Sequence, residues 1–169
     1  MIQYLNILKQ ADIFEGMNPT QLELIGSYCQ DKSFSTGEVI IPEGSDSDEL
    51  YVIVEGEVDI LVNPALVSDQ REEREPVAIA TLGRGQSFGE IALVDRGFRS
   101  ASVLAKQKTR LLILPREELI QLCEAYPQLG YRLMYNLAAD LAFKMRNSGL
   151  LIREELLYRP RENKKTRKK

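Results

Sequence analysis

The apolar residues change their spacing twice along the chain, from helical to alternating and back to helical. Residues 1–30 show helical spacing. Within them, Asn18-Pro19-Thr20-Gln21 supplies a capping Asn, a proline at the first helical position and a glutamine that completes a capping box. The apolar face that follows contains Leu22, Leu24, Ile25 and Tyr28. We therefore predict that the chain begins with helices.

From Gly37 onward, short runs rich in β-branched residues alternate with glycine-containing turns. These runs are EVIIP, LYVIVEG, EVDILV, VAIATL, SASVLA and TRLLILP. In EVDILV, apolar residues alternate with acidic ones, as is typical of a half-solvated antiparallel sheet. About six to eight short strands at this spacing predict a sandwich or jelly roll. The stretch NPALVSDQREEREP is too polar for a strand, and we predict a long hairpin loop there.

Helical spacing returns at Pro115, where PREELIQLCEAY opens with proline and two glutamates. Pro127 begins a longer predicted helix that continues to Ser148 and ends at Gly149. Its apolar stripe recurs every four residues, at Leu129, Leu133, Leu137, Leu141 and Met145. We expect part of this stripe to cover the sheet and the rest to pair with a second copy of the chain. Residues 1–148 would then form the domain, and residues 149–169 a short helix and a basic tail.

Composition limits the chemistry that the chain can perform. A chain of 169 residues that is 44% hydrophobic can bury one good core. Cys29 and Cys123 lack CxxC spacing, which argues against a disulfide framework or structural zinc and fits a cytoplasmic protein. The chain has no histidine, so Ser-His-Asp catalysis, Cys-His catalysis and most zinc sites are excluded. No apolar run approaches the roughly 18 residues of a membrane span.

The charge is divided unevenly along the chain. Arg159 to Lys169 contains seven basic residues and one acidic residue, whereas the rest contains 15 basic and 24 acidic residues. We expect the tail to be solvated and disordered. The acidic body argues against a nucleic-acid-binding face, so sequence-specific DNA binding is not expected.

No enzyme or metal motif emerges from the carboxylates and glycines. The DSDE run at Asp46 and Asp48 lacks the twelve-residue spacing and terminal glutamate of an EF-hand. The GRGQSFGE stretch lacks both the GxGxxG and the GxxxxGK[ST] arrangement. We therefore predict a binding protein without catalytic residues, metal or cofactor.

The segment FGEIALVDRGFRSASVLA, residues 88–105, carries the most specific chemistry. Gly89 permits a tight turn before a short helix, whose first amide groups attract an anion. Arg99 lies before the next strand, where its guanidinium can meet a phosphate oxygen. Glu90 can accept a hydrogen bond from a sugar hydroxyl. A buried Glu90–Arg99 salt bridge is the alternative, and the residues alone do not decide between the two.

This segment resembles the phosphate-binding cassette of the cyclic nucleotide-binding domain family, found in protein kinase A regulatory subunits and the catabolite activator protein. The family pattern is Phe-Gly-Glu-Leu-Ala-Leu, a short linker, then Arg, a small residue, Ala, a hydroxyl or aromatic residue, and Val. This chain reads Phe88-Gly89-Glu90-Ile91-Ala92-Leu93 and then Arg99-Ser100-Ala101-Ser102-Val103. The resemblance covers residues 5–148. It implies an α+β fold, an antiparallel β-roll (double-stranded jelly roll) flanked by N-terminal helices and a long C-terminal helix.

The resemblance also implies a ligand and its contacts. Arg99 would neutralise the cyclic phosphate, and Glu90 would accept the ribose 2′-hydroxyl. Ser100 would contact the phosphate, or guanine when the base is syn. The remaining contacts would be backbone groups of Gly89, Ile91 and Ala92 around the ring, and Val58 and Ile60 as an apolar wall beneath the base. The expected ligand is cAMP, with cGMP as the alternative. Many relatives carry proline just before the arginine, where this chain has Phe98.

The resemblance predicts a non-catalytic sensor whose helices in residues 115–148 move when the ligand binds. We expect a homodimer through the helix after Pro127 and an effector protein that remains to be identified. Catabolite activator relatives continue into a helix-turn-helix domain, for which LLIREELLYRPRENKKTRKK is too short. Two alternatives are a degenerate domain that dimerises or acts as a scaffold without ligand, and a DNA-associated regulator that acts through its basic tail.

Overall fold

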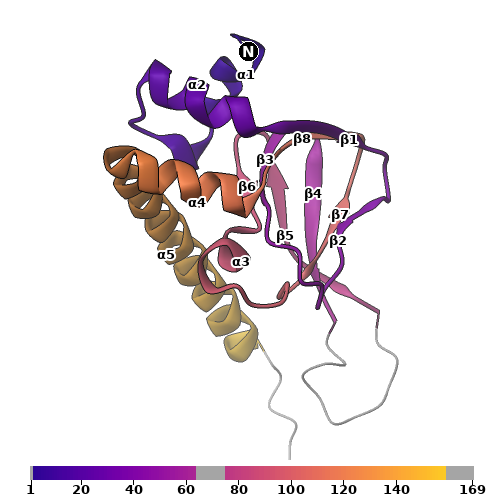
Figure 1. Cartoon of the computed structure of the whole chain (residues 1–169). Helices are drawn as coiled ribbons and strands as arrows, with labels where there is room; N and C mark the ends of the chain where they lie inside the picture. Colours follow the sequence, from indigo (N-terminus) through magenta and orange to yellow (C-terminus); the bar gives the residue numbers. More distant parts are fainter. Residues whose placement is uncertain (1, 64–74, 159–169) are drawn as a thin grey trace, which may run out of the picture.

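The chain folds into a β-roll with helices gathered at one end and along one side (Figure 1). The computed structural model describes residues 2–63 and 75–158, with side chains over residues 4–63 and 75–148. The helices are α1 (Ile2–Leu8), the 3-10 helix η1 (Asp12–Phe14), α2 (Pro19–Tyr28), α3 (Glu90–Asp95), α4 (Arg116–Ala125) and α5 (Pro127–Tyr158). The predicted α+β roll is confirmed.

Two four-stranded antiparallel sheets form the roll. One has the order β1-β8-β3-β6 and the other β2-β7-β4-β5. The strands are β1 (Gln30–Phe34), β2 (Val39–Ile41), β3 (Leu50–Glu55), β4 (Glu57–Val62), β5 (Val77–Gly83), β6 (Ser87–Phe88), β7 (Ser102–Ala105) and β8 (Thr109–Leu114). The six predicted strands are all present. The sequence pattern missed β1, whose first four residues are exposed, and β6, which has only two residues.

The β4–β5 hairpin closes the predicted polar loop. Val62 pairs with Val77, so β4 and β5 are antiparallel neighbours on either side of the predicted loop, and residues 64–74 of that loop lie outside the described part. The register between β4 and β5 shifts after Ile60, which pairs with Ala80, because Leu61 pairs with Ala78. This irregularity leaves Ile79 as an extra residue in β5, as in a β-bulge.

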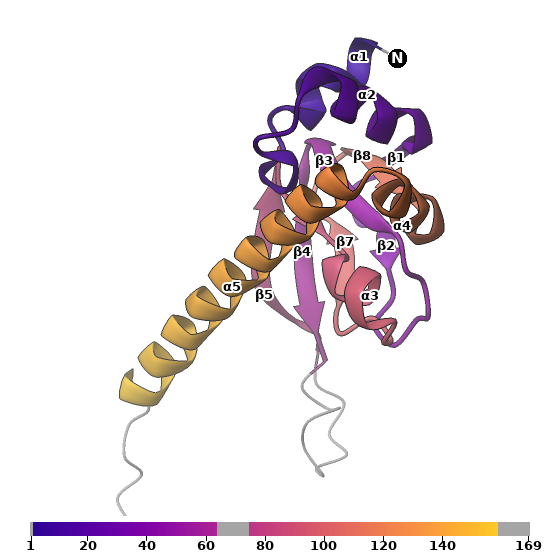
Figure 2. The ribbon, with the colours of Figure 1, turned by 60° about the vertical axis from the view of Figure 1, so that its left-hand side comes forward.

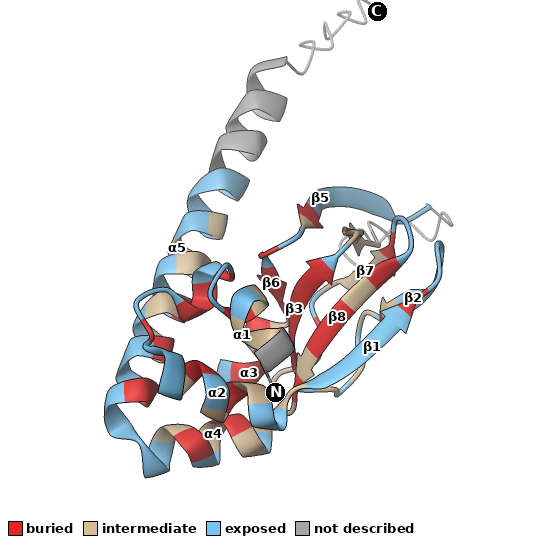
Figure 3. Ribbon diagram, turned by 90° about the horizontal axis from the view of Figure 1, so that it is seen from above, coloured by how far each residue is buried: buried red, intermediate tan, exposed pale blue. Residues whose placement is uncertain are grey.

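The core has two parts, one between the helices and the β1-β8-β3-β6 sheet and one inside the roll. Figure 3 shows buried residues on the strands and on the helix faces that meet them. The first part joins η1, α2, α4 and α5 to β3 and β8, and includes Phe14, Leu22, Leu112, Leu119 and Leu133. The helices therefore belong to the same folded unit as the sheets.

The N-terminal helices begin as the sequence predicts. The side chain of Asn18 accepts from the Gln21 amide at 2.9 Å, and the Gln21 side chain accepts from the Asn18 amide at 3.0 Å. This reciprocal capping box, with Pro19 at the first helical position, fixes the start of α2.

Helix α5 is longer than predicted. It continues through Gly149 to Tyr158, so the predicted helix end is wrong and the proposed boundary at 148/149 falls within a helix. One glycine costs a helix only about 1 kcal/mol, and good helix formers surround this one. Figure 2 shows α5 running obliquely past the sheets. No helix in the described part of the chain is long and apolar enough to cross a membrane.

The apolar stripe of α5 is divided between the core and the surface, and the predicted packing of part of it against the chain's own domain is present. Leu129, Leu133 and Leu137 are buried in the core of their own domain, at 1% exposure or less. Met145, further along the same stripe, is 74% exposed. The first half of α5 is therefore a core helix, and these leucines are not available to a second copy.

Candidate functional site

The cassette begins with a turn that only glycine fits. Gly89 caps α3 with φ +86°, in the left-handed region. A Cβ at this position would lie 2.7 Å from the Glu49 carbonyl oxygen and 2.8 Å from Arg99 Nη1. Glycine is therefore required both by the backbone conformation and by the close approach of the arginine.

The backbone of Arg99 is fixed to the loop before β3. The Arg99 amide donates to the Ser45 carbonyl, and the Gly44 amide donates to the Arg99 carbonyl, both at 2.8 Å. These two bonds extend the strand-like pairing of β2 and β7 beyond their ends. The predicted position of Arg99, at the mouth of a strand, follows from this pairing.

The guanidinium of Arg99 connects the same loop to the cassette. It donates to the Gly89 carbonyl at 3.0 Å, the Glu49 carbonyl at 2.8 Å and the Ser47 hydroxyl at 2.9 Å. The Glu49 carboxylate lies 3.4 Å from Nη2. Arg99 is 6% exposed, so this cation is held rigidly at the turn before α3. Such an arrangement can bind an anion without first ordering a long side chain.

An aromatic pair supports the arginine. Tyr51 and Phe88 stack with their ring centroids 4.9 Å apart, and the Arg99 guanidinium carbon lies 5.8 Å from the Tyr51 ring centroid. Burial and the neighbouring Glu49 raise the pKa of Tyr51 to about 12, so the phenol stays neutral. Sequence reasoning missed this pair because Tyr51 and Phe88 meet only through the pairing of β3 with β6.

Glu90 is the first residue of α3 and is 5% exposed. Its Oε1 accepts from Lys144 Nζ of α5 at 2.8 Å. Glu90 and Arg99 form no ion pair with each other, so the alternative of a Glu90–Arg99 salt bridge is wrong. Each charge has its own partner, and both are held at the turn.

Lys144 is the residue of this site that sequence reasoning missed. Besides Glu90, it contacts Asp140 Oδ2 at 2.7 Å and donates to the Ser87 carbonyl at 3.0 Å. Burial acts to lower the pKa of Lys144, but its interactions with the two carboxylates outweigh burial and the pKa is raised. A lysine on a helix is usually solvated, and the signal here was its position between Phe143 and Met145 in an apolar stretch.

The other predicted contact residues differ in accessibility. Ile91 is 45% exposed and Ser100 is exposed, whereas Ala92 is buried. Of the predicted wall residues, Val58 is fully buried within the roll and Ile60 is half-buried beside it. Ile60 is therefore the wall residue with surface to offer a ligand. Phe98, which stands where many relatives have proline, is 74% exposed and occupies no core position.

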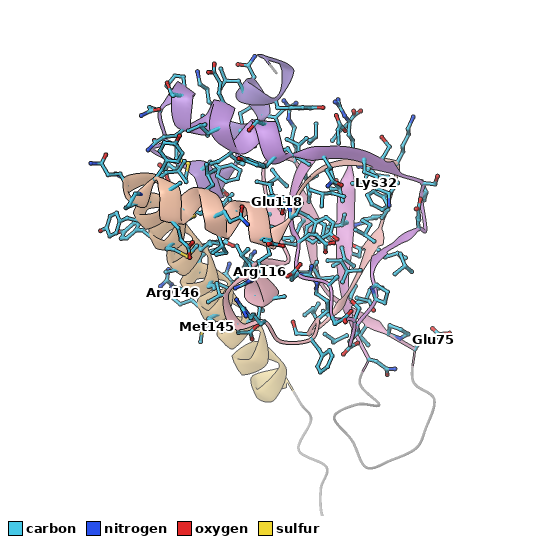
Figure 4. All side chains as sticks on the ribbon, viewed as in Figure 1. Lys32, Glu75, Arg116, Glu118, Met145 and Arg146 are labelled. Carbon is cyan, nitrogen blue, oxygen red and sulfur yellow. The ribbon has the colours of Figure 1, made fainter. Side chains whose placement is uncertain are left out.

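The cassette also contacts α4. Arg116, at the start of α4, donates from Nε to the Leu93 carbonyl of α3 at 2.9 Å. Figure 4 shows Arg116 between α4 and α3. A nearby hollow of about 420 Å³ is lined by Asp46, Asp48, Arg96, Gly97, Arg116 and Glu117, none of them a predicted ligand contact. The cassette is thus linked to both C-terminal helices, to α4 by Arg116 and to α5 by Lys144.

The chain is similar to known proteins in sequence and in fold. Residues 31–126 match the family model described as "Cyclic nucleotide-binding domain". A cyclic AMP receptor protein of Thermus thermophilus is 34% identical to this chain over 143 residues. The matched region covers 85% of this chain and 61% of that protein, so the chain spans less than two thirds of the relative.

Solved structures show the same fold. A cyclic nucleotide-binding domain from Methylobacillus flagellatus superposes with a TM-score of 0.76 and 27% identity, over 91% of this chain and 83% of that one. The regulatory domain of Toxoplasma gondii PKA, co-crystallised with cAMP, gives a TM-score of 0.61 and 25% identity, over 72% of this chain and 43% of that one.

Proposed function

Because this chain belongs to the cyclic nucleotide-binding domain family, we propose that it is a non-catalytic sensor that binds cAMP. The observation that carries the proposal is the rigid Arg99 guanidinium at the Gly89 turn, with Glu90 directly after it. In this proposal the arginine neutralises the cyclic phosphate, and the glutamate accepts the ribose 2′-hydroxyl. The amides at the start of α3 and the Ser100 hydroxyl add hydrogen bonds to the phosphate.

The choice of cAMP over cGMP follows from relatives. The Thermus relative is a cyclic AMP receptor protein, and the Toxoplasma regulatory domain was crystallised with cAMP. Ile60 supplies the half-buried apolar surface on which a purine would rest. Arg99, Glu90 and Ile60 would then contact the phosphate, the ribose and the base in turn.

The proposed output is a movement of α4 and α5. Both helices contact the cassette, through Arg116 to α3 and through Lys144 to Glu90. A ligand that reorients the cassette changes the partners of these two side chains. An effector protein that recognises α5 is part of the proposal, as is a cytoplasmic location, which the free thiols of Cys29 and Cys123 support.

We also propose that α5 forms a homodimer through apolar positions that its own domain does not bury, of which Met145 belongs to the predicted stripe. Its exposed or half-exposed apolar positions are spaced alternately four and three residues apart, as in a coiled coil. They are Tyr131, Tyr135, Ala138, Ala142 and Met145. The small alanines in the middle of this face permit close approach of a second helix.

Calorimetric titration with cAMP and cGMP tests the proposed ligand. The expected result is saturable one-site binding that is tighter for cAMP, without AMP appearing at a rate that depends on protein concentration. Absence of binding by either nucleotide would favour the ligand-free scaffold. Protein-dependent release of AMP would contradict the non-catalytic role.

A further inference from the structure

Lys144 makes three short contacts, of which two leave α5, one to the cassette at Glu90 and one to the Ser87 carbonyl just before it. Its ammonium lies 2.8 Å from Glu90 Oε1, 2.7 Å from Asp140 Oδ2 and 3.0 Å from the Ser87 carbonyl oxygen. Asp140 precedes Lys144 by one helical turn, so it holds the lysine side chain on the face of α5 that meets the cassette. The contact between Lys144 and Glu90 brings this part of α5 to the start of α3.

The two oxygens of Glu90 have different surroundings. Oε1 accepts from Lys144, whereas Oε2 accepts from no residue that the structure describes. Oε2 is also not sealed from solvent, unlike Asp140 Oδ2. Glu90 therefore presents one acceptor oxygen that is held and one that remains open to a hydroxyl donor.

The charge of the cluster explains why the lysine matters to this acceptor. The Glu90 side chain is 7% exposed, and its Oε1 pairs with the Lys144 ammonium at 2.8 Å. A carboxylate oxygen accepts a hydrogen bond from a hydroxyl group more strongly than a neutral acceptor does. The lysine also restricts the rotamers of Glu90, so fewer conformations are lost when a hydroxyl binds.

We propose that Lys144 is a positioning residue for ribose recognition, which holds Glu90 by Oε1 so that Oε2 accepts the ribose 2′-hydroxyl. The inference rests on the proposed function and adds the residue that sets selectivity for the hydroxyl. Lys144 belongs to α5, so recognition of the ribose depends on α5 being docked against the cassette. The docking of α5 and the binding of the hydroxyl are then reciprocally coupled.

The test compares cAMP with 2′-deoxyadenosine 3′,5′-cyclic monophosphate, which lacks only the hydroxyl in question. The wild type should bind cAMP about ten- to a hundred-fold more tightly than the deoxy analogue, because one hydrogen bond to a charged group is lost. In Lys144→Met the ratio of the affinity for cAMP to the affinity for the deoxy analogue should fall to about threefold or less, as in Glu90→Gln. Lys144→Arg, which keeps a cationic donor, should restore most of it.

Arg146→Met is the matched control. Arg146 lies on the same turn of α5, is exposed and forms no ion pair with any residue in the described ranges, so its replacement removes the same charge without touching Glu90. The ratio should remain at the wild-type value in this variant. The double variant Glu90→Gln/Lys144→Met should lose no more selectivity than either single variant, since both residues act on one hydrogen bond.

The ratio separates positioning from a merely structural role. A structural role would weaken both nucleotides by the same factor and leave their ratio unchanged, which would overturn the inference. Tighter cAMP binding by Lys144→Met would also overturn it, because the lysine would then compete with the ligand. If the wild type binds neither nucleotide, the proposed function fails together with the inference. Should Lys144→Met not fold, Lys144→Ala, which also removes the donor to Glu90, carries the same expectation.

Discussion

Arg99 Nη1 donates to the Gly89 carbonyl oxygen at 3.0 Å, joining two residues that lie on opposite sides of α3 in the chain. The bond closes the cassette into a loop whose two ends are fixed to each other. The same arginine also donates to the Glu49 carbonyl of the preceding loop. The position of the cation therefore depends on Gly89 having no side chain.

Gly89→Ala should abolish cAMP binding and destabilise the fold. A Cβ would lie 2.7 Å from the Glu49 carbonyl oxygen, in addition to the cost of about 1–2 kcal/mol for a left-handed alanine. Gly37→Ala is the control, since Gly37 has φ +82° and no atom within 4 Å of its Cβ position. Urea unfolding should show only the conformational cost for Gly37→Ala and a larger loss for Gly89→Ala. Equal losses with intact binding would contradict this account.

Two glutamate substitutions in α5 test which face of the helix forms the dimer. Met145→Glu should dissociate the dimer and leave the domain folded, because Met145 is 74% exposed. Leu137→Glu should instead unfold the domain, since Leu137 is 1% exposed and a buried unpaired carboxylate costs several kcal/mol. Sedimentation and circular dichroism separate the two effects. A wild type that sediments as a monomer at tens of micromolar (an order-of-magnitude choice for a weak interface) would contradict the dimer.

The strand pair β1–β8 should contribute stability that depends on pH. Arg110 hydrogen-bonds Asp31 across these strands and lowers the pKa of that carboxyl. A carboxyl whose pKa is lower in the folded state stabilises the fold above its unfolded pKa of about 3.9, and the contribution is lost as pH falls through the folded pKa. Asp31→Asn should cost about 0.2–1 kcal/mol at pH 7, as expected for a solvent-accessible pair.

The loss of stability in Asp31→Asn should shrink as the pH falls below about 3.9, because the carboxyl is then protonated in the unfolded state while it stays ionised in the folded state. The loss should vanish below the lowered folded pKa, where both states are protonated. Urea unfolding at several pH values measures this difference. Arg110→Gln should lower the free energy of unfolding by a similar amount at pH 7. The double variant should lower it little more than either single variant does. A difference between wild type and Asp31→Asn that stays constant down to pH 2 would show that the ion pair is not its source.

Sequence patterns predicted most of the fold because most elements carry their own local signal. The capping box at Asn18 and the alternation in EVDILV each report structure within a few residues. Strand β1 carries no such signal, since Gln30 to Ser33 are polar and exposed and become a strand only by pairing with β8. Gly149 gave a false signal, because a single glycine weakens a helix without ending it.

The site was predictable in part for the same reason. Gly89, Glu90 and Arg99 lie in one short segment, so their chemistry could be inferred together. Lys144 is 54 residues from Glu90 in the chain, and only the docking of α5 brings the two together. The apolar stripe of α5 was predicted to cover the sheet in part, but which leucines do so could not be predicted, because periodicity shows that a helix face is apolar and does not show what covers it.

The melting temperature with and without cAMP, for wild type and Arg99 variants, tests the central proposal most directly. At a cAMP concentration about 100 times the wild-type Kd, binding adds about 2.7 kcal/mol, or roughly 5–10 °C for a domain of this size. Arg99→Ala should lower the affinity roughly 10²–10³-fold by leaving the phosphate charge unpaired. Arg99→Lys keeps the positive charge but lacks the planar guanidinium with its paired donors, so it should also bind cAMP more weakly.

Both Arg99 variants should melt lower without ligand, because the guanidinium also holds the loop at Ser47 and Glu49. Arg96→Lys is the control, being an exposed arginine of the same segment. We predict that cAMP raises the melting temperature of the wild type and of Arg96→Lys. In Arg99→Ala it should raise the melting temperature by about 1 °C or less. A wild-type rise that persists undiminished in Arg99→Ala would show that Arg99 is not the partner of the phosphate, and no rise in the wild type would contradict cAMP binding itself.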